Sequence, residues 1–282
     1  MPSMKGIQQR ISNVSTTRQI IRAMDMVAST KLHKARARLD GIRPLYGEVR
    51  QKAAELARCE EAADHVFAAP RTVKSTAYIV LTSNKGLCGS YNLRVVEKAL
   101  EHMGRGGHEK IIAVGGKGYE AFRRLHKNIL YRIPDTHEAQ IYETAGRLGE
   151  LAASLYRSGE ADEVYVAYTY FESTLSHQPR LERLLPLPMG TDGTGAGGGM
   201  RYEPDAHAFI DHFIPLYLHT CLFAAASEAA ACEHAARMIN MDSAGKNATE
   251  VIDDLGRMYN RKRQAAITQE LSEIVGGANI LE

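Results

Sequence analysis

Residues 209–278 read FIDHFIPLYLHTCLFAAASEAAACEHAARMINMDSAGKNATEVIDDLGRMYNRKRQAAITQELSEIVGGA. This stretch is typical of one continuous helix, interrupted only by Pro215, Gly245 and Gly256. At ~1.5 Å per residue such a helix is about 100 Å long, whereas a compact chain of this length has a radius of gyration of about 19 Å. Because the helix cannot be buried inside its own globule, we expect most of it to lie against something else.

An alanine-rich seam runs along the first half of this helix. Small seam residues let two helix axes approach closely, so we expect a tightly packed partner. Pro215 predicts a kink, because its ring clashes with the carbonyl group of Asp211. Gly245 and Gly256 each cost about 1 kcal/mol relative to alanine, which makes residues 245–256 the weakest part. The seam residues follow steps of four and three: Leu222, Ala225, Ala229, Cys232, Ala236 and Ile239.

Residues 3–57 supply a matching pattern. Eleven positions step by four and three, nine of them apolar, and no glycine lies between Gly6 and Gly41. A 3.5-residue repeat sustained over more than three heptads is the signature of a coiled coil. One domain joins the end of this helix to the start of the other, so we expect antiparallel packing, with the longer second helix projecting beyond the first. The positions are Ile7, Ile11, Val14, Arg18, Ile21, Asp25, Ala28, Leu32, Ala35, Leu39 and Ile42.

Between the two helical stretches the pattern changes to short strands and helices. The order β-α-β-α-β-α-β-β is typical of a mainly parallel, Rossmann-like sheet with helices on its faces and an antiparallel strand added late. Asn92 is expected to cap the first of these helices, and Gly190–Gly199, with six glycines in ten residues, predicts a flexible surface loop. The predicted strands are 75–81, 110–114, 128–133, 163–171 and 178–187, and the predicted helices are 93–103, one that ends at His126, and 138–157.

The predicted fold class is therefore α/β. A long antiparallel two-helix coiled coil is built from the N- and C-termini, residues 1–58 and 205–282, and a Rossmann-like α/β domain, residues 59–204, is inserted between them. The net charge of +2 conceals an asymmetry, because the first of these segments carries +8 and the last −5. Opposite charges suit two helices that lie together.

Composition excludes several classes of protein. No apolar run approaches the ~18–20 residues of a membrane span, and the start MPSMKGIQQR lacks the apolar core of a secretory signal. Four cysteines without CxxC or Cys/His spacing indicate a reducing compartment and no metal site. Cys221 and Cys232 lie about 16 Å apart along one helix, too far to form a disulfide.

Two glycine-containing segments raise the question of a nucleotide site. TSNKGLCGSYN at 82–92 follows a strand and opens a helix, but it lacks GxGxxG and GK[ST]. We interpret it as a tight turn that needs Gly86 and Gly89, and we interpret GGKG at 115–118 as a turn as well. Cys88 has no evident histidine partner, and the chain contains neither GxSxG nor HExxH. The sequence therefore predicts no catalytic residue, cofactor or metal.

Four stretches together resemble one known family, the gamma subunit of F-type ATP synthases in its bacterial form. They occur in the same order and at the same separations as in that family, and the likeness covers essentially the whole chain. The stretches are IRAMDMVASTKLHKA (21–35), SNKGLCGSYN (83–92), SEAAACEHAARMINMDSAGKNA (227–248) and YNRKRQAAITQELSEIVGGA (259–278).

The resemblance implies a rotor rather than an enzyme. In the family the coiled coil turns inside a ring of three alpha and three beta subunits, while the Rossmann-like foot rests on the membrane c-ring and binds the epsilon subunit. It further implies a peripheral position on the cytoplasmic face of the bacterial plasma membrane, with membrane contact only through the c-ring.

The resemblance also implies three groups of contact residues, and it makes Arg263 onward the unpaired tip. Arg263, Gln264, Thr268 and Glu270 match positions that contact the catch loop of a beta subunit. Met24, Lys31, Lys34, Arg36 and Arg38 lie in the stretch that faces an acidic beta-subunit region. Ile274, Val275, Ile280 and Leu281 match the tip held in an apolar sleeve.

Two other classes stay open on sequence grounds. A nucleic-acid-binding coiled coil would use the basic N-terminal arm, although residues 1–45 contain no aromatic side chain that would stack on bases. A dinucleotide enzyme with an oligomerisation arm would bind NAD(H), NADP(H) or ATP, and we expect none of these to bind.

Overall fold

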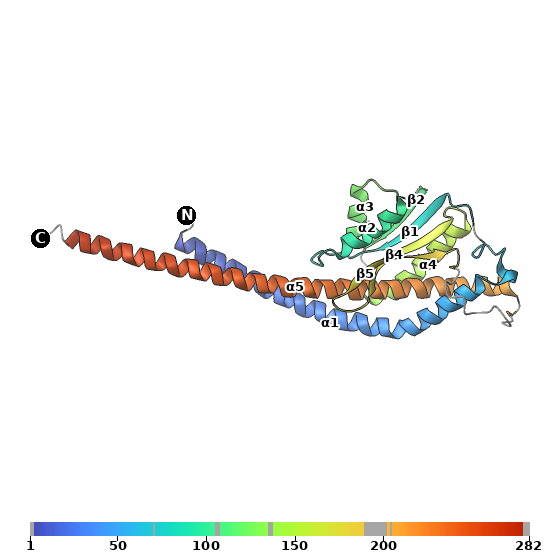
Figure 1. Cartoon of the computed structure of the whole chain (residues 1–282), viewed down its shortest axis with the longest axis horizontal. Coiled ribbons are helices and arrows are strands. Elements are labelled where there is room, and N and C mark those ends of the chain that lie inside the picture. Colours follow the sequence, from blue (N-terminus) through green and yellow to red (C-terminus); the bar gives the residue numbers. More distant parts are fainter. Residues whose placement is uncertain are drawn as a thin grey trace. The chain divides into compact units, whose positions relative to one another are not determined.

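The computed structural model of the protein describes residues 3–69, 71–104, 108–134, 138–188, 202–203 and 205–278. The predicted loop Gly190–Gly199 lies outside these residues. Ten main elements follow one another along the chain, in the order that the sequence predicts (Figure 1). They are α1 (Met4–Leu56), β1 (Ser75–Leu81), α2 (Tyr91–Met103), β2 (His108–Val114), α3 (Gly116–Arg124), β3 (Ile129–Ile133), α4 (Ile141–Arg157), β4 (Glu163–Phe171), β5 (His177–Leu185) and α5 (Ala206–Ala278).

The chain forms two compact units. One consists of the residues up to Ala28 together with those from Arg237 onward, and the other of residues 29–236. Both long helices contribute to both units, since α1 and α5 each cross the boundary. The division into segments 1–58, 59–204 and 205–282 stays a prediction about function.

The sheet of the larger unit has the strand order β3-β2-β1-β4-β5. The first four strands are parallel, and β5 pairs with β4 in the antiparallel sense. The predicted parallel sheet with a late antiparallel strand is therefore confirmed. The chain runs outward from β1 through β2 to β3 and then returns to the other side of β1 with β4, so the topological switch point lies between β1 and β4.

Alternate side chains of the strands enter two different cores. In β1, Ala77 and Ile79 belong to a core shared with α1, α4 and α5, whereas Tyr78 and Val80 belong to a core shared with α2. This is the period of two expected for a sheet covered on both faces. Helix α5 thus serves as one layer of the α/β unit, which explains the burial of its alanine-rich seam.

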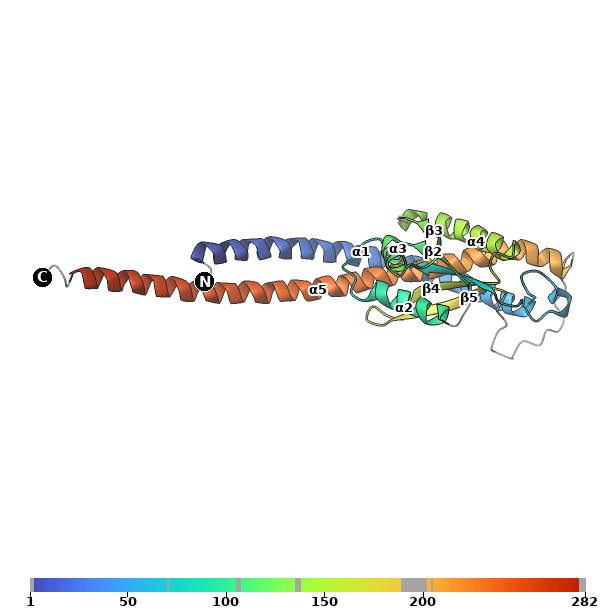
Figure 2. The same ribbon diagram turned by 90° about the horizontal axis from the view of Figure 1, so that it is seen from above.

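In the smaller unit α1 and α5 lie side by side and run antiparallel, as predicted (Figure 2). Arg18 Nη1 contacts Thr249 Oγ1 at 3.5 Å, and a Cβ on Gly245 would lie 3.7 Å from Ile21. None of the eleven predicted seam positions of α1 is exposed. Helix α5 continues without interruption through Pro215, Gly245 and Gly256.

One expectation about membranes needs correction. Within the described residues, α5 is long and apolar enough by length and composition to cross a membrane, contrary to the estimate from apolar runs. More than half of its most apolar window, 56%, is buried inside the protein. Because α5 packs against the sheet, a core helix accounts for this composition.

Candidate functional site

Two facing positions in the smaller unit, Arg18 opposite Thr249 and Ile21 opposite Gly245, show where α5 extends past the start of α1. Helix α1 begins at Met4, fourteen residues before Arg18, so in an antiparallel pair it ends opposite Arg263, fourteen residues after Thr249. From Arg263 to Ile274 every residue is exposed except Ala266, which is half-buried. The predicted unpaired tip therefore begins where the two helices stop facing each other.

The predicted catch residues lie on this tip. Arg263, Gln264, Thr268 and Glu270 are all exposed on α5, and Thr268 Oγ1 donates a hydrogen bond of 2.9 Å to the carbonyl oxygen of Gln264. A helix turns by about 100° per residue. Arg263 and Glu270 therefore share one face, while Gln264 and Thr268 share another about 100° away, and a contact of all four with one partner stays a prediction.

An exposed apolar stripe lies on the same tip. Ile267, Leu271 and Ile274 are 49%, 58% and 68% exposed, at the i, i+4, i+7 spacing of one helix face. Only Ile274 was predicted. The signal for the other two was present in the sequence, as an apolar helical period that continues beyond the length of α1. The side chains of Val275, Ile280 and Leu281 lie outside the described residues.

The residues predicted to face an acidic beta-subunit region do not form one surface. Lys31, Lys34 and Arg36 are exposed on α1, whereas Met24 and Arg38 are half-buried. Lys31 and Lys34 lie about 60° apart round the helix, but Arg36 lies about 140° from Lys31. A single flat partner surface would therefore contact the two lysines without Arg36, and the contact itself stays a prediction.

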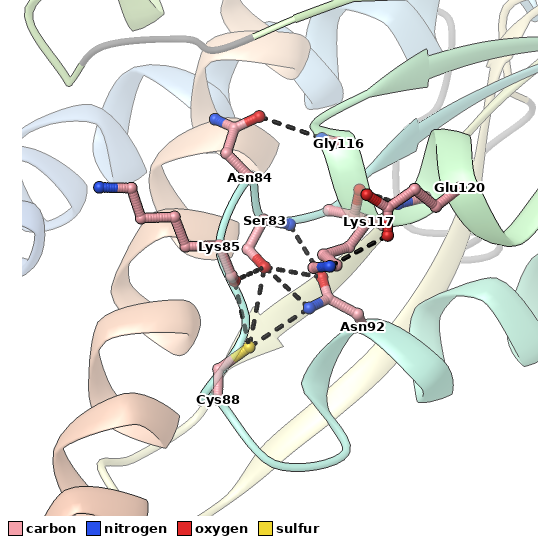
Figure 3. A network of polar contacts seen from close by, with 10 residues as sticks. Ser83, Asn84, Lys85, Cys88, Asn92, Gly116, Lys117 and Glu120 are labelled. Carbon is pink, nitrogen blue, oxygen red and sulfur yellow. Dashed lines mark hydrogen bonds and ion pairs between the residues drawn. The ribbon is translucent and has the colours of Figure 1, made fainter.

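The loop after β1 and the start of α3 bind each other rather than a ligand (Figure 3). Gly116 N–H donates to Asn84 Oδ1 at 3.0 Å, Lys117 N–H to the carbonyl oxygen of Ser83 at 3.0 Å, and Gly118 N–H to Thr82 Oγ1 at 2.9 Å. Free N–H groups at the start of a helix can hold a phosphate, and these three are already bound within the chain. Their occupation supports the interpretation of GGKG as structural.

Two details of this loop correct the sequence analysis. Asn92 does not cap a helix, because α2 begins at Tyr91 and Asn92 Oδ1 instead accepts the N–H of Ser83 at 2.8 Å. The predicted need for glycine is right at Gly89, with φ 58°, but wrong at Gly86, because the other positive φ belongs to Leu87, at 65°. The side chains of Asn92 and Cys88 hold the loop closed in Figure 3.

The crevice at the carboxyl ends of β1 and β2 is nearly filled. Its cavity measures about 80 Å³ and is lined by Leu81, Val114, residues of α4, and Ala226, Ala229 and Glu233 of α5. Ligand pockets usually measure about 300–1,000 Å³. Helix α5 thus lies over the carboxyl ends of β1 and β2, beside the switch point between β1 and β4 at which Rossmann-like domains bind nucleotides.

The buried thiols of Cys221 and Cys232 are held in the protonated form. Burial raises the pKa of Cys221 to about 12 and raises the pKa of Cys232 as well, which disfavours the reactive thiolate. Among the described residues, no group of three or more histidine, cysteine, aspartate or glutamate side chains is arranged to hold a metal ion.

Comparisons with known proteins agree along the whole chain. A protein-family model described as "ATP synthase" matches residues 3–281. The chain is 39% identical over 285 residues to the ATP synthase gamma chain of Alkaliphilus metalliredigens, which covers 99% of both chains. It is 38% identical over 291 residues to the ATP synthase gamma chain of Chlorobaculum tepidum, which covers 100% of both.

Solved structures share the fold. A chain in the cryo-EM structure of the Euglena gracilis mitochondrial ATP synthase OSCP/F1/c-ring assembly matches with a TM-score of 0.73 and 18% identity, over 99% of this chain and 94% of that one. A chain in the rotor of the same organism's enzyme matches with a TM-score of 0.70 and 16% identity, over 94% and 98%. From the family model and the full-length relatives, we conclude that this chain belongs to the ATP synthase gamma chain family.

Proposed function

We propose that this chain is the rotating central shaft of an ATP synthase. In this role the paired helices stand inside a ring of three alpha and three beta subunits, and the α/β unit binds the c-ring and the epsilon subunit. Proton flow turns the c-ring, the foot turns with it, and the shaft brings each beta subunit in turn through its nucleotide-binding conformations. Family membership supports the complex, and the geometry of the tip supports the mode of action.

The observation that carries the proposal is the end of α5. Beyond Arg263 a helix with exposed polar residues on two faces and an exposed apolar stripe continues without a facing helix. A single helix of this kind is marginal in water unless a partner covers its apolar side. A surrounding ring of subunits would cover it from all sides.

The mechanism requires stiffness and asymmetry. The close packing of α1 and α5 supplies stiffness, because small residues along the seam bring the two axes together. An off-axis rod presents a different surface to each beta subunit at every angle, so its rotation biases several multi-state partners in sequence. The chain itself would carry no catalytic residue, and ATP chemistry would take place in the beta subunits.

Location follows from the same assignment. A shaft seated on the c-ring would be a peripheral protein at the cytoplasmic face of the bacterial plasma membrane, with membrane contact only through the c-ring. The nucleic-acid alternative gains no support from the relatives and structures described above.

Reconstitution with the cognate alpha and beta subunits tests the proposal. We expect one copy of this chain per three alpha–beta pairs, measured by native mass spectrometry, and cooperative ATP hydrolysis with unidirectional rotation that depends on the chain. A mixture that hydrolyses ATP equally well with and without it would refute the function.

A second experiment addresses the catch residues. Arg263→Ala should lower ATP hydrolysis by up to about tenfold, equivalent to losing a contact worth about 1.4 kcal/mol in the rotating complex. The control is Arg257→Ala, which removes another exposed arginine of α5 six residues earlier, paired with Asp254. Equal effects of the two variants would remove the catch assignment and leave the rotor function intact.

A further inference from the structure

Strand β4 ends between the two long helices, at Phe171. Arg43 of α1 donates from Nη2 to the carbonyl oxygen of Phe171 at 2.7 Å. Glu228 of α5 accepts the N–H of the same residue on Oε2 at 3.3 Å. The two side chains also approach each other, with Arg43 Nη2 3.6 Å from Glu228 Oε1. One residue of the sheet is thus bound by both long helices, once by each.

A second polar contact lies farther along the same helix face of α1. Glu182 of β5 accepts hydrogen bonds of 2.8 Å from Tyr46 of α1 and from Tyr168 of β4. Arg50 of α1 approaches Glu182 at 3.9 Å. Positions 43, 46 and 50 are spaced i, i+3 and i+7, so they face the sheet together.

Helix α5 makes equivalent contacts with the same two strands. Tyr217 donates to the carbonyl oxygen of Leu184 at 3.1 Å, and Cys232 Sγ lies 3.4 Å from the carbonyl oxygen of Thr169. Tyr217 is fully buried, and Glu228 and Thr169 nearly so. All of these residues belong to the compact unit 29–236.

Polar contacts of this kind do something that the apolar core does not. The hydrophobic effect is non-directional, so on its own it does not specify which polar groups of a helix and a sheet meet. A buried hydrogen bond is directional, and breaking it without solvent access leaves an unsatisfied polar group. The Arg43–Phe171–Glu228 contact therefore fixes the position of both helices along the sheet.

We propose that Arg43 and Glu228 are positioning residues of a joint that makes the sheet and the long helices turn as one body. This inference rests on the proposed rotor function and assigns a place in the molecule through which torque passes from the foot to the shaft. The joint touches neither nucleotide nor proton, so its failure should show in the coupling between the two and leave the chemistry intact.

The test uses the complete synthase in proteoliposomes at pH 8 and, in parallel, the soluble alpha–beta assembly with this chain. Glu228→Ala removes the acceptor of the Phe171 N–H, and Arg43→Ala removes the fork that binds the carbonyl oxygen of Phe171. ATP hydrolysis by the soluble assembly should stay within about twofold of wild type. Protons pumped per ATP hydrolysed should fall at least about fivefold in Arg43→Ala, the lower end of ordinary coupling between sites. Glu228→Ala should shift this ratio in the same direction, whereas Glu228→Gln, whose amide oxygen can still accept the Phe171 N–H, should stay close to wild type.

Three controls separate a joint from a merely structural role. Arg147→Ala removes an arginine paired with Glu143 on the exposed face of α4 and should leave pumping per ATP unchanged. Arg43→Lys keeps the charge without the fork and should restore part of the coupling. Circular dichroism of each variant checks folding, because a poorly folded chain lowers pumping and hydrolysis together and does not change their ratio.

The outcomes distinguish the two proposals. If the wild-type chain fails to stimulate hydrolysis, the rotor function itself is wrong. If it stimulates hydrolysis and a folded Glu228→Ala variant pumps as many protons per ATP as wild type, the joint is refuted. That conclusion holds even if Arg43→Ala does not fold.

Discussion

Glu228 offers a quantitative test of the buried contacts. The residue is 7% exposed, and burial raises its pKa from 4.5 to about 7, against the opposing effects of the Phe171 N–H, Arg43 and Arg180. The carboxylate of Glu182 contributes in the same direction as burial. In the unfolded chain the group returns to its ordinary pKa, so the folded state binds this proton more tightly than the unfolded state does.

The sign and size of the effect follow from this difference. The contribution of the Glu228 proton to the free energy of unfolding is complete below about pH 4.5. It is lost as the pH rises to about 7. At about 1.4 kcal/mol per pKa unit, the loss is at most about 3 kcal/mol. Glu228→Gln carries no titrating group at this position. The variant should therefore gain stability relative to wild type, by up to about 3 kcal/mol, between pH 5 and pH 8.

The assay is denaturant unfolding followed by circular dichroism at several pH values in this range. Comparing the two proteins cancels the titration of the histidines, which both contain. Glu143→Gln, which removes an exposed carboxylate paired with Arg147, controls for the loss of one negative charge and should change the unfolding free energy by less than about 1 kcal/mol throughout. A difference between Glu228→Gln and wild type that stays constant from pH 5 to pH 8 would refute the argument from burial.

Two further predictions concern the turns after β1 and β2 and the tip of α5. Gly115→Ala should lower the unfolding free energy by about 2 kcal/mol or more, because φ is +91° and a Cβ would lie 2.1 Å from the carbonyl oxygen of Thr82. Gly86→Ala, which meets open space, should be neutral within about 1 kcal/mol in the same denaturant assay. Leu271→Asn should leave the melting temperature of the isolated chain unchanged but lower ATP hydrolysis in the reconstituted assembly. A normal rate would show that no partner covers the apolar stripe.

Periodic features were predictable because they depend on spacing alone. The seam from Ile7 to Ile42 needed only a facing helix, and α5 supplied one. The parallel sheet with its late antiparallel strand was likewise predictable from the order of the elements. Strand ends differ from the predictions by up to two residues, because hydrogen bonding at the end of a ladder depends on the neighbouring strand.

Features that depend on several segments were not predictable. Asn92 has a strong local preference for an N-cap, but the backbone of Ser83 competes for its side-chain oxygen. Gly86 looked indispensable, yet the closed loop places the left-handed conformation on Leu87. The local sequence does not distinguish Glu228 from the other polar residues of α5. Only the packing of three elements together shows that it is buried against the end of β4.

The place of α5 in the α/β unit connects these observations. In a Rossmann-like sheet, the crevice outside the carboxyl ends of the strands is the ordinary position for a nucleotide. Here α5 lies over that edge, and the cavity left measures about 80 Å³. The N–H groups at the start of α3 are bound by Asn84, Ser83 and Thr82, so these groups hold two segments of the chain together. A sheet edge that usually binds a ligand thus packs against a helix here. A rotating shaft requires such a firm attachment at its base.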